Sequence, residues 1–196
     1  MTNPPTAKKN NKPRLSILVL AAGSSRRFTG NQSKLLAPIG NLCLLEKVLH
    51  ELKPFNSESI HIVINQHSAD IEKIASHYHY VTNANTEQGL ASSLRTGIEF
   101  IRQQSPSTEA VLIILGDQPA VTTSDLKLLV DNFYLAHKTR VTGSKQQVIL
   151  AVAGIYGNPP TPGVPAVFDK QLFIKLCSLK GDQGAKPILN KLLEQQ

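Results

Sequence analysis

The chain has 196 residues, of which 41% are hydrophobic and 5% aromatic, and a formal net charge of +7. This length is enough for one domain with a substantial core, and no apolar run reaches the roughly 20 residues of a membrane span. Lys8, Lys9, Lys12 and Arg14 supply four of the excess charges, and aromatic residues are sparse, so we expect no nucleic-acid surface.

The first 14 residues are polar and proline-containing, and they lack the apolar region of a signal peptide. We predict a disordered basic tail over residues 1–14, a single domain over residues 15–196 and a cytoplasmic location. Cys43 and Cys177 lie far apart without CxxC spacing, which favours two reduced, buried thiols over a disulfide or a metal site.

Strand and helix patterns alternate along the rest of the chain. Branched apolar runs predict strands at residues 15–20, 60–64, 78–82, 111–115, 148–152 and 166–168. Amphipathic patterns predict helices at residues 42–52, 69–76, 91–103, 124–136, 170–179 and 185–193. Residues 154–165 hold three glycines and four prolines, so we expect an irregular loop over the active edge or a short connection that returns to the strand at residues 166–168.

This alternation predicts an α/β fold with three layers, in which helices cover both faces of a mainly parallel, Rossmann-like sheet. Such sheets bind ligands beyond the carboxyl ends of their strands. The segments that follow the first and fourth predicted strands should therefore open onto the same edge.

A small-residue, cationic loop follows the first predicted strand. It reads Leu20-Ala21-Ala22-Gly23-Ser24-Ser25-Arg26-Arg27, and Lys34 comes a few residues later. Small residues let backbone N–H groups approach phosphate oxygens, and the cations neutralise their charge. The loop matches neither the Walker A nor the G-x-G-x-x-G motif. These residues alone fit a phosphate site and an ordinary turn with solvated arginines about equally.

Two acidic residues lie in turn-like segments further along. Asp117 follows the most apolar strand, where its carboxylate could bind Mg²⁺ or cap a turn or the next helix. Asp182, within Gly181-Asp182-Gln183-Gly184, could close the same metal site or serve as the N-cap of the last helix.

Another helix opens at Gln88-Gly89, with Ser92 and Ser93 in its first turn. Exposed backbone donors and hydroxyl groups there suit a nucleobase edge or an anion. The alternative is a plain helix start, followed by core packing through Leu94 and Ile98.

Four segments in this order resemble the signature of the nucleotidyltransferases that handle molybdenum cofactor, within the wider superfamily of nucleotide-sugar and cytidylyl transferases. The segments are residues 20–27 with Lys34, then 88–98, 115–121 and 181–186, and they span nearly all of the chain after residue 14. The resemblance implies a fold of the nucleotide-diphospho-sugar transferase type and an Mg²⁺-dependent enzyme.

The resemblance also implies a role for particular residues. The implied catalytic residues are Arg27, Lys34 and Asp117, and the implied metal ligands are Asp117 and Asp182. The implied nucleotide-binding residues are Leu20, Ala21, Ala22, Gly23, Ser25, Gly89 and Ser93.

Ala21-Ala22-Gly23 is similar to the CTP-using branch of this family, because the GTP users have Ala-Gly-Gly there. Residues 163–168 and 181–186 also resemble the molybdenum cofactor cytidylyltransferases. We therefore expect transfer of CMP from CTP to the phosphate of a molybdopterin-type cofactor, with release of pyrophosphate. The expected partners are CTP, this phosphorylated acceptor, and a molybdoenzyme or its chaperone.

Three alternatives remain open at this point: a sugar phosphate or another small phosphorylated acceptor, GTP in place of CTP, and a nucleotide-binding module without catalysis. Two departures from the family pattern bear on them. Residues 28–33 place two extra residues before Lys34, and Lys186 stands where an arginine is more usual, which loses bidentate geometry.

Overall fold

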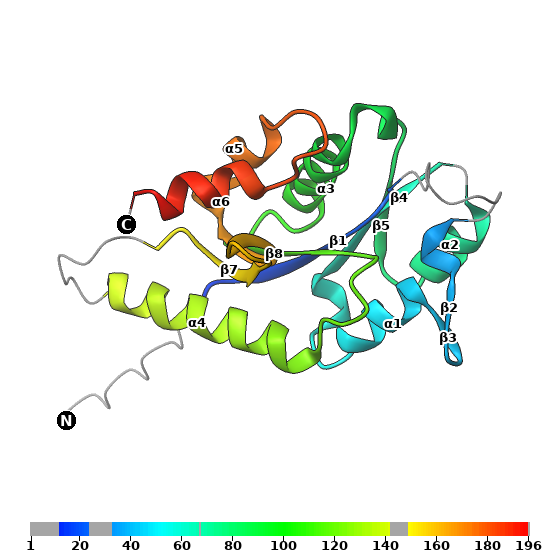
Figure 1. Ribbon diagram of the computed structural model, residues 1–196, viewed down its shortest axis with the longest axis horizontal. Helices are drawn as coiled ribbons and strands as arrows, with labels where there is room; N and C mark the ends of the chain where they lie inside the picture. The colour runs from blue at the N-terminus through cyan, green and yellow to red at the C-terminus, as the bar shows by residue number, and fades with distance from the viewer. Residues whose placement is uncertain (1–11, 24–32, 67, 142–148, 196) are drawn as a thin grey trace, which may run out of the picture.

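The computed structural model describes residues 12–23, 33–66, 68–141 and 149–195 (Figure 1). Residues 1–11 of the predicted tail, and the predicted site residues Ser25 and Arg27, lie outside these ranges. Residues 12–14 contact the domain: the carbonyl oxygen of Arg14 accepts hydrogen bonds from the backbone N–H groups of Glu109 (2.8 Å) and Ala110 (3.1 Å).

A six-stranded sheet forms the centre, in the order β5-β4-β1-β6-β8-β7. Its strands are β1 (Leu15–Ala21), β4 (Ile60–Asn65), β5 (His79–Asn83), β6 (Ala110–Leu115), β7 (Ala151–Tyr156) and β8 (Thr161–Asp169). The first four are mutually parallel, whereas β8 runs antiparallel to both β6 and β7. A separate antiparallel pair joins β2 (Pro38–Ile39) to β3 (Leu42–Cys43). The predicted α/β fold with a mainly parallel sheet is confirmed.

Helices cover both faces of this sheet, as predicted. One face packs against α1 (Leu44–Glu51), α2 (Ala69–Ala75) and α4 (Thr123–Val141). The other packs against α3 (Leu90–Gln104), α5 (Phe173–Cys177) and α6 (Lys186–Leu193), which lie together above the sheet in Figure 1. The described residues also form short 3-10 turns, namely η1 (Lys34–Leu36), η2 (Ser57–Ser59), η3 (Thr86–Gln88) and η4 (Lys170–Leu172).

The central strand β1 is apolar from Ile17 to Ala21, and its place in the fold explains this. Ile17 and Val19 point into the core beneath α1, α2 and α4, whereas Leu18 and Leu20 point into the core beneath α3, α5 and α6. A strand with both faces covered cannot alternate apolar and polar residues. The continuous run in β1 therefore follows from its place in the middle layer.

The glycine- and proline-rich stretch over residues 154–165 is the main departure from the predicted elements. The expected irregular loop is instead the end of β7, a short turn and the first half of β8. Here β8 pairs with β7 alone, from Gly154 opposite Gly163 to Tyr156 opposite Thr161. A strand with one partner tolerates proline wherever the missing N–H would point away from that partner.

Helix boundaries also differ from the prediction, and the helix expected at residues 124–136 is observed as Thr123–Val141. The helix expected at residues 42–52 begins at Leu44, because Leu42 and Cys43 pair with β2. The helix expected at residues 170–179 is divided into η4 and the short α5. Within the described ranges, no helix has both the length and the apolar character needed to cross a membrane.

Candidate functional site

The strand order reverses direction between β1 and β6. From β1 the chain adds β4 and then β5 on one side, and it returns to place β6 on the other side. In open α/β sheets the crevice beyond the carboxyl ends at such a switch point is the usual ligand site. The backbone N–H of Gly116 donates to the carbonyl oxygen of Leu20 (2.9 Å), so the turn after β6 lies directly beside the end of β1.

Two predicted catalytic residues meet at this point. Lys34 Nζ lies 3.1 Å from Asp117 Oδ2, and the two side chains are 50% and 36% exposed. Lys34 is held at the start of η1, where the Ser33 hydroxyl accepts a hydrogen bond from the Leu35 N–H (3.3 Å). Because both charged groups reach solvent beside the end of β1, they are accessible to an incoming phosphate and its counterion.

Gln118, which had no predicted role, fixes the turn that carries Asp117. Its side-chain oxygen accepts a hydrogen bond from the Leu115 N–H (3.0 Å), and its side-chain NH₂ donates to the carbonyl oxygen of Val164 (2.8 Å). The turn is thereby tied to both β6 and β8. Only the sheet order shows that β8 lies close enough for this bridge.

A second part of the site forms at the start of α3. Asp182 Oδ1 accepts a hydrogen bond from the Leu90 N–H (3.1 Å), and the Ala91 N–H donates to the carbonyl oxygen of Gly181 (3.0 Å). Asp182 therefore caps α3 rather than α6, which begins after Ala185 without a side-chain cap. The alternative of an N-cap on the last helix is wrong because the turn folds back onto α3.

This cap also places Asp182 relative to Asp117. Since α3 follows η3 and the carboxyl end of β5, its first residues lie at the same edge of the sheet as the turn after β6. One Asp182 oxygen is used by the cap, and the side chain is exposed. Two carboxylates thus face one edge from segments 65 residues apart in the sequence (182 less 117).

The first turn of α3 rests on a buried polar cluster. The side-chain NH₂ of Asn83 donates to the hydroxyl groups of Ser92 (2.8 Å) and Ser93 (3.0 Å), and its oxygen accepts from the Asn85 N–H (2.9 Å). Ser93 is 4% exposed, so its hydroxyl supports the helix start, and the nucleobase contact implied for it stays a prediction. Asn83 had no predicted role, although an amide at the end of a predicted strand is a signal for such a cluster.

Gly89 shapes the backbone between this cluster and Asp182. Its φ of +85° lies in the left-handed region that favours glycine. A Cβ there would lie 2.7 Å from the Gly181 carbonyl carbon and would collide with the Asp182 carboxylate. Gly89 therefore permits the turn at 181–182 to dock against α3.

Glu51 anchors the chain just beyond the Asp117 turn. Its carboxylate pairs with Lys47 (2.7 Å) and accepts hydrogen bonds from the N–H (2.9 Å) and hydroxyl (2.9 Å) of Thr123. The Lys47 hydrogen bond, followed by those from Thr123, lowers the pKa of Glu51 to about 2. This ionised carboxylate holds the start of α4 to the end of α1.

The carboxylates at this edge suit a metal ion that the substrate helps to coordinate. No group of three or more His, Cys, Asp or Glu residues that could hold a metal occurs in the parts of the chain that the structure describes. Mg²⁺ commonly uses only one or two protein carboxylates, together with substrate phosphate oxygens and water. Asp117, which already holds the Lys34 ammonium group, and the exposed Asp182 fit that requirement.

Residues 17–196 match the model of the MobA-like NTP transferase domain. The chain belongs to this family. The expected nucleotidyltransferase superfamily is thereby confirmed, and the molybdenum cofactor branch within it remains a proposal.

Individual relatives match more distantly. The bifunctional protein GlmU of Coxiella burnetii is 27% identical over 120 residues, which are 60% of this chain and 25% of that protein. The match thus spans a quarter of the length of this curated relative.

Solved structures share the fold at low identity. Rv0371c of Mycobacterium tuberculosis has a TM-score of 0.69 at 21% identity, over 89% of this chain and 82% of that one, and it has also been solved in complex with manganese. A cytidylyltransferase from Leptospira borgpetersenii has a TM-score of 0.61 at 18% identity, over 93% of this chain and 73% of that one. These similarities confirm the α/β nucleotidyltransferase fold.

Proposed function

We propose that this protein is an Mg²⁺-dependent nucleotidyltransferase that moves CMP from CTP to the phosphate of a molybdopterin-type cofactor and releases pyrophosphate. The observation that carries the proposal is the contact between Lys34 and Asp117 at the switch point between β1 and β6, in a chain of the MobA-like NTP transferase family. Residues 15–196 would form the single catalytic domain, with residues 1–14 as a basic tail.

Two further observations support the choice of CTP and of a divalent metal. Ala22 stands where the resemblance distinguishes CTP users from GTP users, and a cytidylyltransferase shares this fold. The fold also accommodates a divalent ion in Rv0371c, where that ion is manganese. In this chain, Asp117 and Asp182 would hold Mg²⁺, which neutralises charge on the reacting phosphates.

The remaining residues bind and orient the nucleotide. The backbone of Leu20 to Gly23, at the end of β1, would face the nucleotide together with Gly89 and Ser93 at the start of α3. Lys34 would neutralise charge on the pyrophosphate that leaves, a role that the resemblance also gives to Arg27. Ser25 is assigned to the same phosphate-binding loop.

The bond changes need no general base. An oxygen of the acceptor phosphate, which is already anionic, forms the new bond to the α-phosphorus as the bond to the β-phosphate oxygen breaks. The protein therefore contributes alignment and charge neutralisation. The product would pass to a molybdoenzyme or its chaperone.

Pyrophosphate release tests this proposal directly. The purified chain, Mg²⁺ and molybdopterin-type cofactor are combined with CTP, GTP, ATP or UTP, with Asp117→Asn as the inactive control. Release with CTP alone supports the proposal, and release with GTP alone contradicts the nucleotide assignment. Binding of CTP without release would contradict the acceptor, and a sugar phosphate series would then be tested. Failure to bind any nucleotide would contradict the whole assignment.

A further inference from the structure

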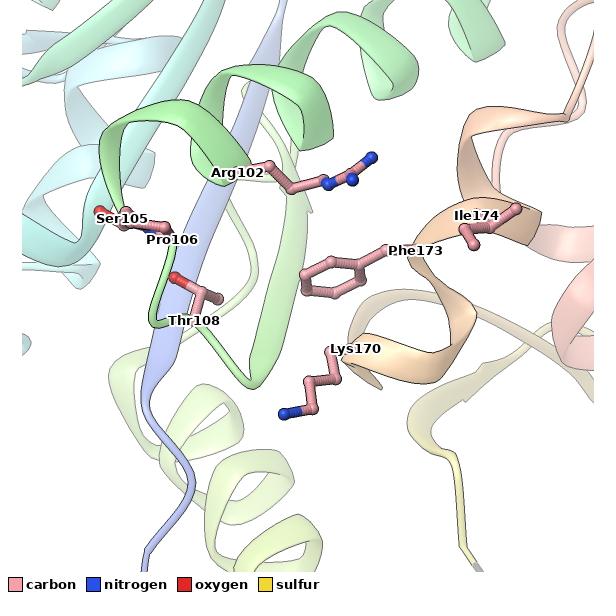
Figure 2. Close-up of a pocket in the computed structure, with 7 residues that line it drawn as sticks. All are labelled: Arg102, Ser105, Pro106, Thr108, Lys170, Phe173 and Ile174. Carbon is pink, nitrogen blue, oxygen red and sulfur yellow. The ribbon is translucent and has the colours of Figure 1, made fainter.

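A cavity lies at the edge of the sheet opposite the candidate site. It has a volume of about 390 Å³ and opens between the carboxyl end of α3 and the segment formed by η4 and α5 (Figure 2). At this edge the first residue of β6, Ala110, pairs with the last residue of β8, Asp169. Because α3 has 15 residues, the cavity lies roughly 22 Å from the end of α3 that carries Gly89.

Two cations, Arg102 and Lys170, line the cavity. Arg14 is tied to the loop that carries Ser105 and Thr108, because its side-chain Nε donates to the Ser107 carbonyl oxygen (2.8 Å). Within the described residues Arg102 forms no ion pair, whereas Lys170 Nζ lies 3.8 Å from the Glu109 carboxylate. The charged residues of the lining are thus two cations, and the carboxylates nearby belong to Glu109, which pairs with Lys170, and to the neighbouring residue Asp169.

Apolar side chains form part of the cavity wall. Figure 2 shows the Phe173 ring between Arg102 and Lys170, with Ile174 on the same short helix. Phe173 is 6% exposed, whereas Ile174 is 77% exposed. Ser105 and Thr108 line the facing loop, and Figure 2 shows their hydroxyl oxygens on the side away from Phe173. The Thr108 hydroxyl hydrogen-bonds to that of Ser16 (2.7 Å), and the Ser105 hydroxyl lies 3.4 Å from Nε2 of His61.

We propose that this cavity binds a small organic anion, in which a phosphate or carboxylate group is attached to a flat apolar ring. The anionic group would contact Arg102 and Lys170, which flank Phe173, and the ring would pack beside Phe173 and Ile174. The volume falls within the range of small-molecule sites, and two cations beside an apolar surface match both halves of such a ligand. This site is separate from the candidate NTP site, and the inference does not depend on the proposed function.

Phenyl phosphate is the probe for this site. The full chain is labelled with ¹⁵N, and its backbone amide signals are followed during titration with phenyl phosphate and with inorganic phosphate. We expect saturable shifts at residues 102–108 and 170–174, with tighter binding of phenyl phosphate than of inorganic phosphate. Absence of saturable shifts there, or shifts confined to the surroundings of Lys34 and Asp117, would overturn the proposal.

Charge-removing variants test the contacts. Arg102→Gln and Lys170→Gln should each weaken phenyl phosphate binding by about tenfold. Lys175→Gln, an exposed change on α5 outside the lining of the cavity, is the matched control and should change the affinity less than about twofold. All three side chains are exposed, so the variants should keep the native amide spectrum. Equal weakening by Lys175→Gln would show a diffuse charge effect and contradict the site.

Discussion

Asp117 connects the fold to the proposed chemistry through a single partly exposed carboxylate. Its contact with Lys34 joins two segments that are 83 residues apart in the sequence. An exposed ion pair of this kind contributes at most about 1 kcal/mol to stability. The contact matters because it places an ammonium group and a carboxylate at the end of β1, next to the turn that contains Gly116.

Replacement of Asp117 by asparagine should remove activity while the fold is kept. We expect Asp117→Asn to lower metal-dependent pyrophosphate release by at least about a hundredfold. The variant would hold Mg²⁺ less well, and Mg²⁺ is the ion that would neutralise charge on the reacting phosphates. The free energy of unfolding should change by less than about 1 kcal/mol. Asp131→Asn, on the exposed face of α4, is the matched control. Wild-type turnover in a folded Asp117→Asn variant would remove Asp117 from the site.

Gly89 allows a second residue-scale test, because both its conformation and its surroundings exclude a side chain. Gly89→Ala should lower the free energy of unfolding by about 1–3 kcal/mol and weaken CTP binding, since the turn at 181–182 must move. Gly40→Ala is the control: Gly40 also has a positive φ (+61°), but its Cβ would meet nothing within 4 Å. Equal losses in the two variants would show that backbone strain alone acts and that the contact with Gly181 is unimportant.

At the scale of elements, the periodicity of apolar residues predicted the positions of strands and helices that depend on local sequence. The strand at residues 60–64 is observed as Ile60–Asn65, and the helix at residues 69–76 as Ala69–Ala75. The β7–β8 pairing was missed because glycine and proline usually indicate loops. They are compatible with a strand here only because this part of β8 has a partner strand on one side. The Asp182 cap was missed for a similar reason: its partner, Leu90, is 92 residues away.

The contact between α3 and the sheet depends on another glycine. A Cβ at Gly97 would lie 2.5 Å from a Leu18 methyl group and 2.8 Å from a Val63 methyl group. Gly97→Ala should therefore lower the free energy of unfolding by about 1–3 kcal/mol, although alanine favours an isolated helix by about 1 kcal/mol. Urea unfolding measures this, with the exposed Glu99→Ala as control. A stabilised Gly97→Ala variant would show that α3 does not pack this closely.

Across the whole molecule, the sheet order determines which distant segments meet. The carboxyl edge collects the end of β1, the turn with Asp117 and the start of α3 with Asp182, whereas the amino edge carries the cationic cavity. The sequence motifs predicted that the first two segments share an edge, because each follows a parallel strand. They could not predict the Lys34–Asp117 contact, which requires β6 to lie next to β1.

Stability of the whole fold should depend on pH through His61. This side chain is fully buried, with Nδ1 3.0 Å from the Ser59 carbonyl oxygen and its ring stacked on His79 at 5.4 Å. Burial, followed by the charge of His79, lowers the pKa of His61 below its ordinary value of 6.5. The unfolded chain therefore takes up a proton more readily, and stability is lost as pH falls below about 6.5.

Urea unfolding at pH 7.5 and at pH 5.0 measures this dependence. His61→Gln, which cannot titrate, should show a smaller loss of unfolding free energy between the two pH values than the wild type. The exposed His50→Gln variant should retain the wild-type dependence. An unchanged dependence in His61→Gln would mean that other groups govern the acid side of the stability curve.

The measurement that tests the central claim most directly is the affinity for Mn²⁺, used as a spectroscopic substitute for Mg²⁺, in the presence of CTP. Asp117→Asn and Asp182→Asn should each weaken Mn²⁺ binding by at least about tenfold, and Asp131→Asn should not. Asparagine preserves the acceptor that caps α3, so a loss in Asp182→Asn reports on the metal rather than on the helix start. Wild-type affinity in both site variants would contradict a metal and nucleotide site at this edge of the sheet.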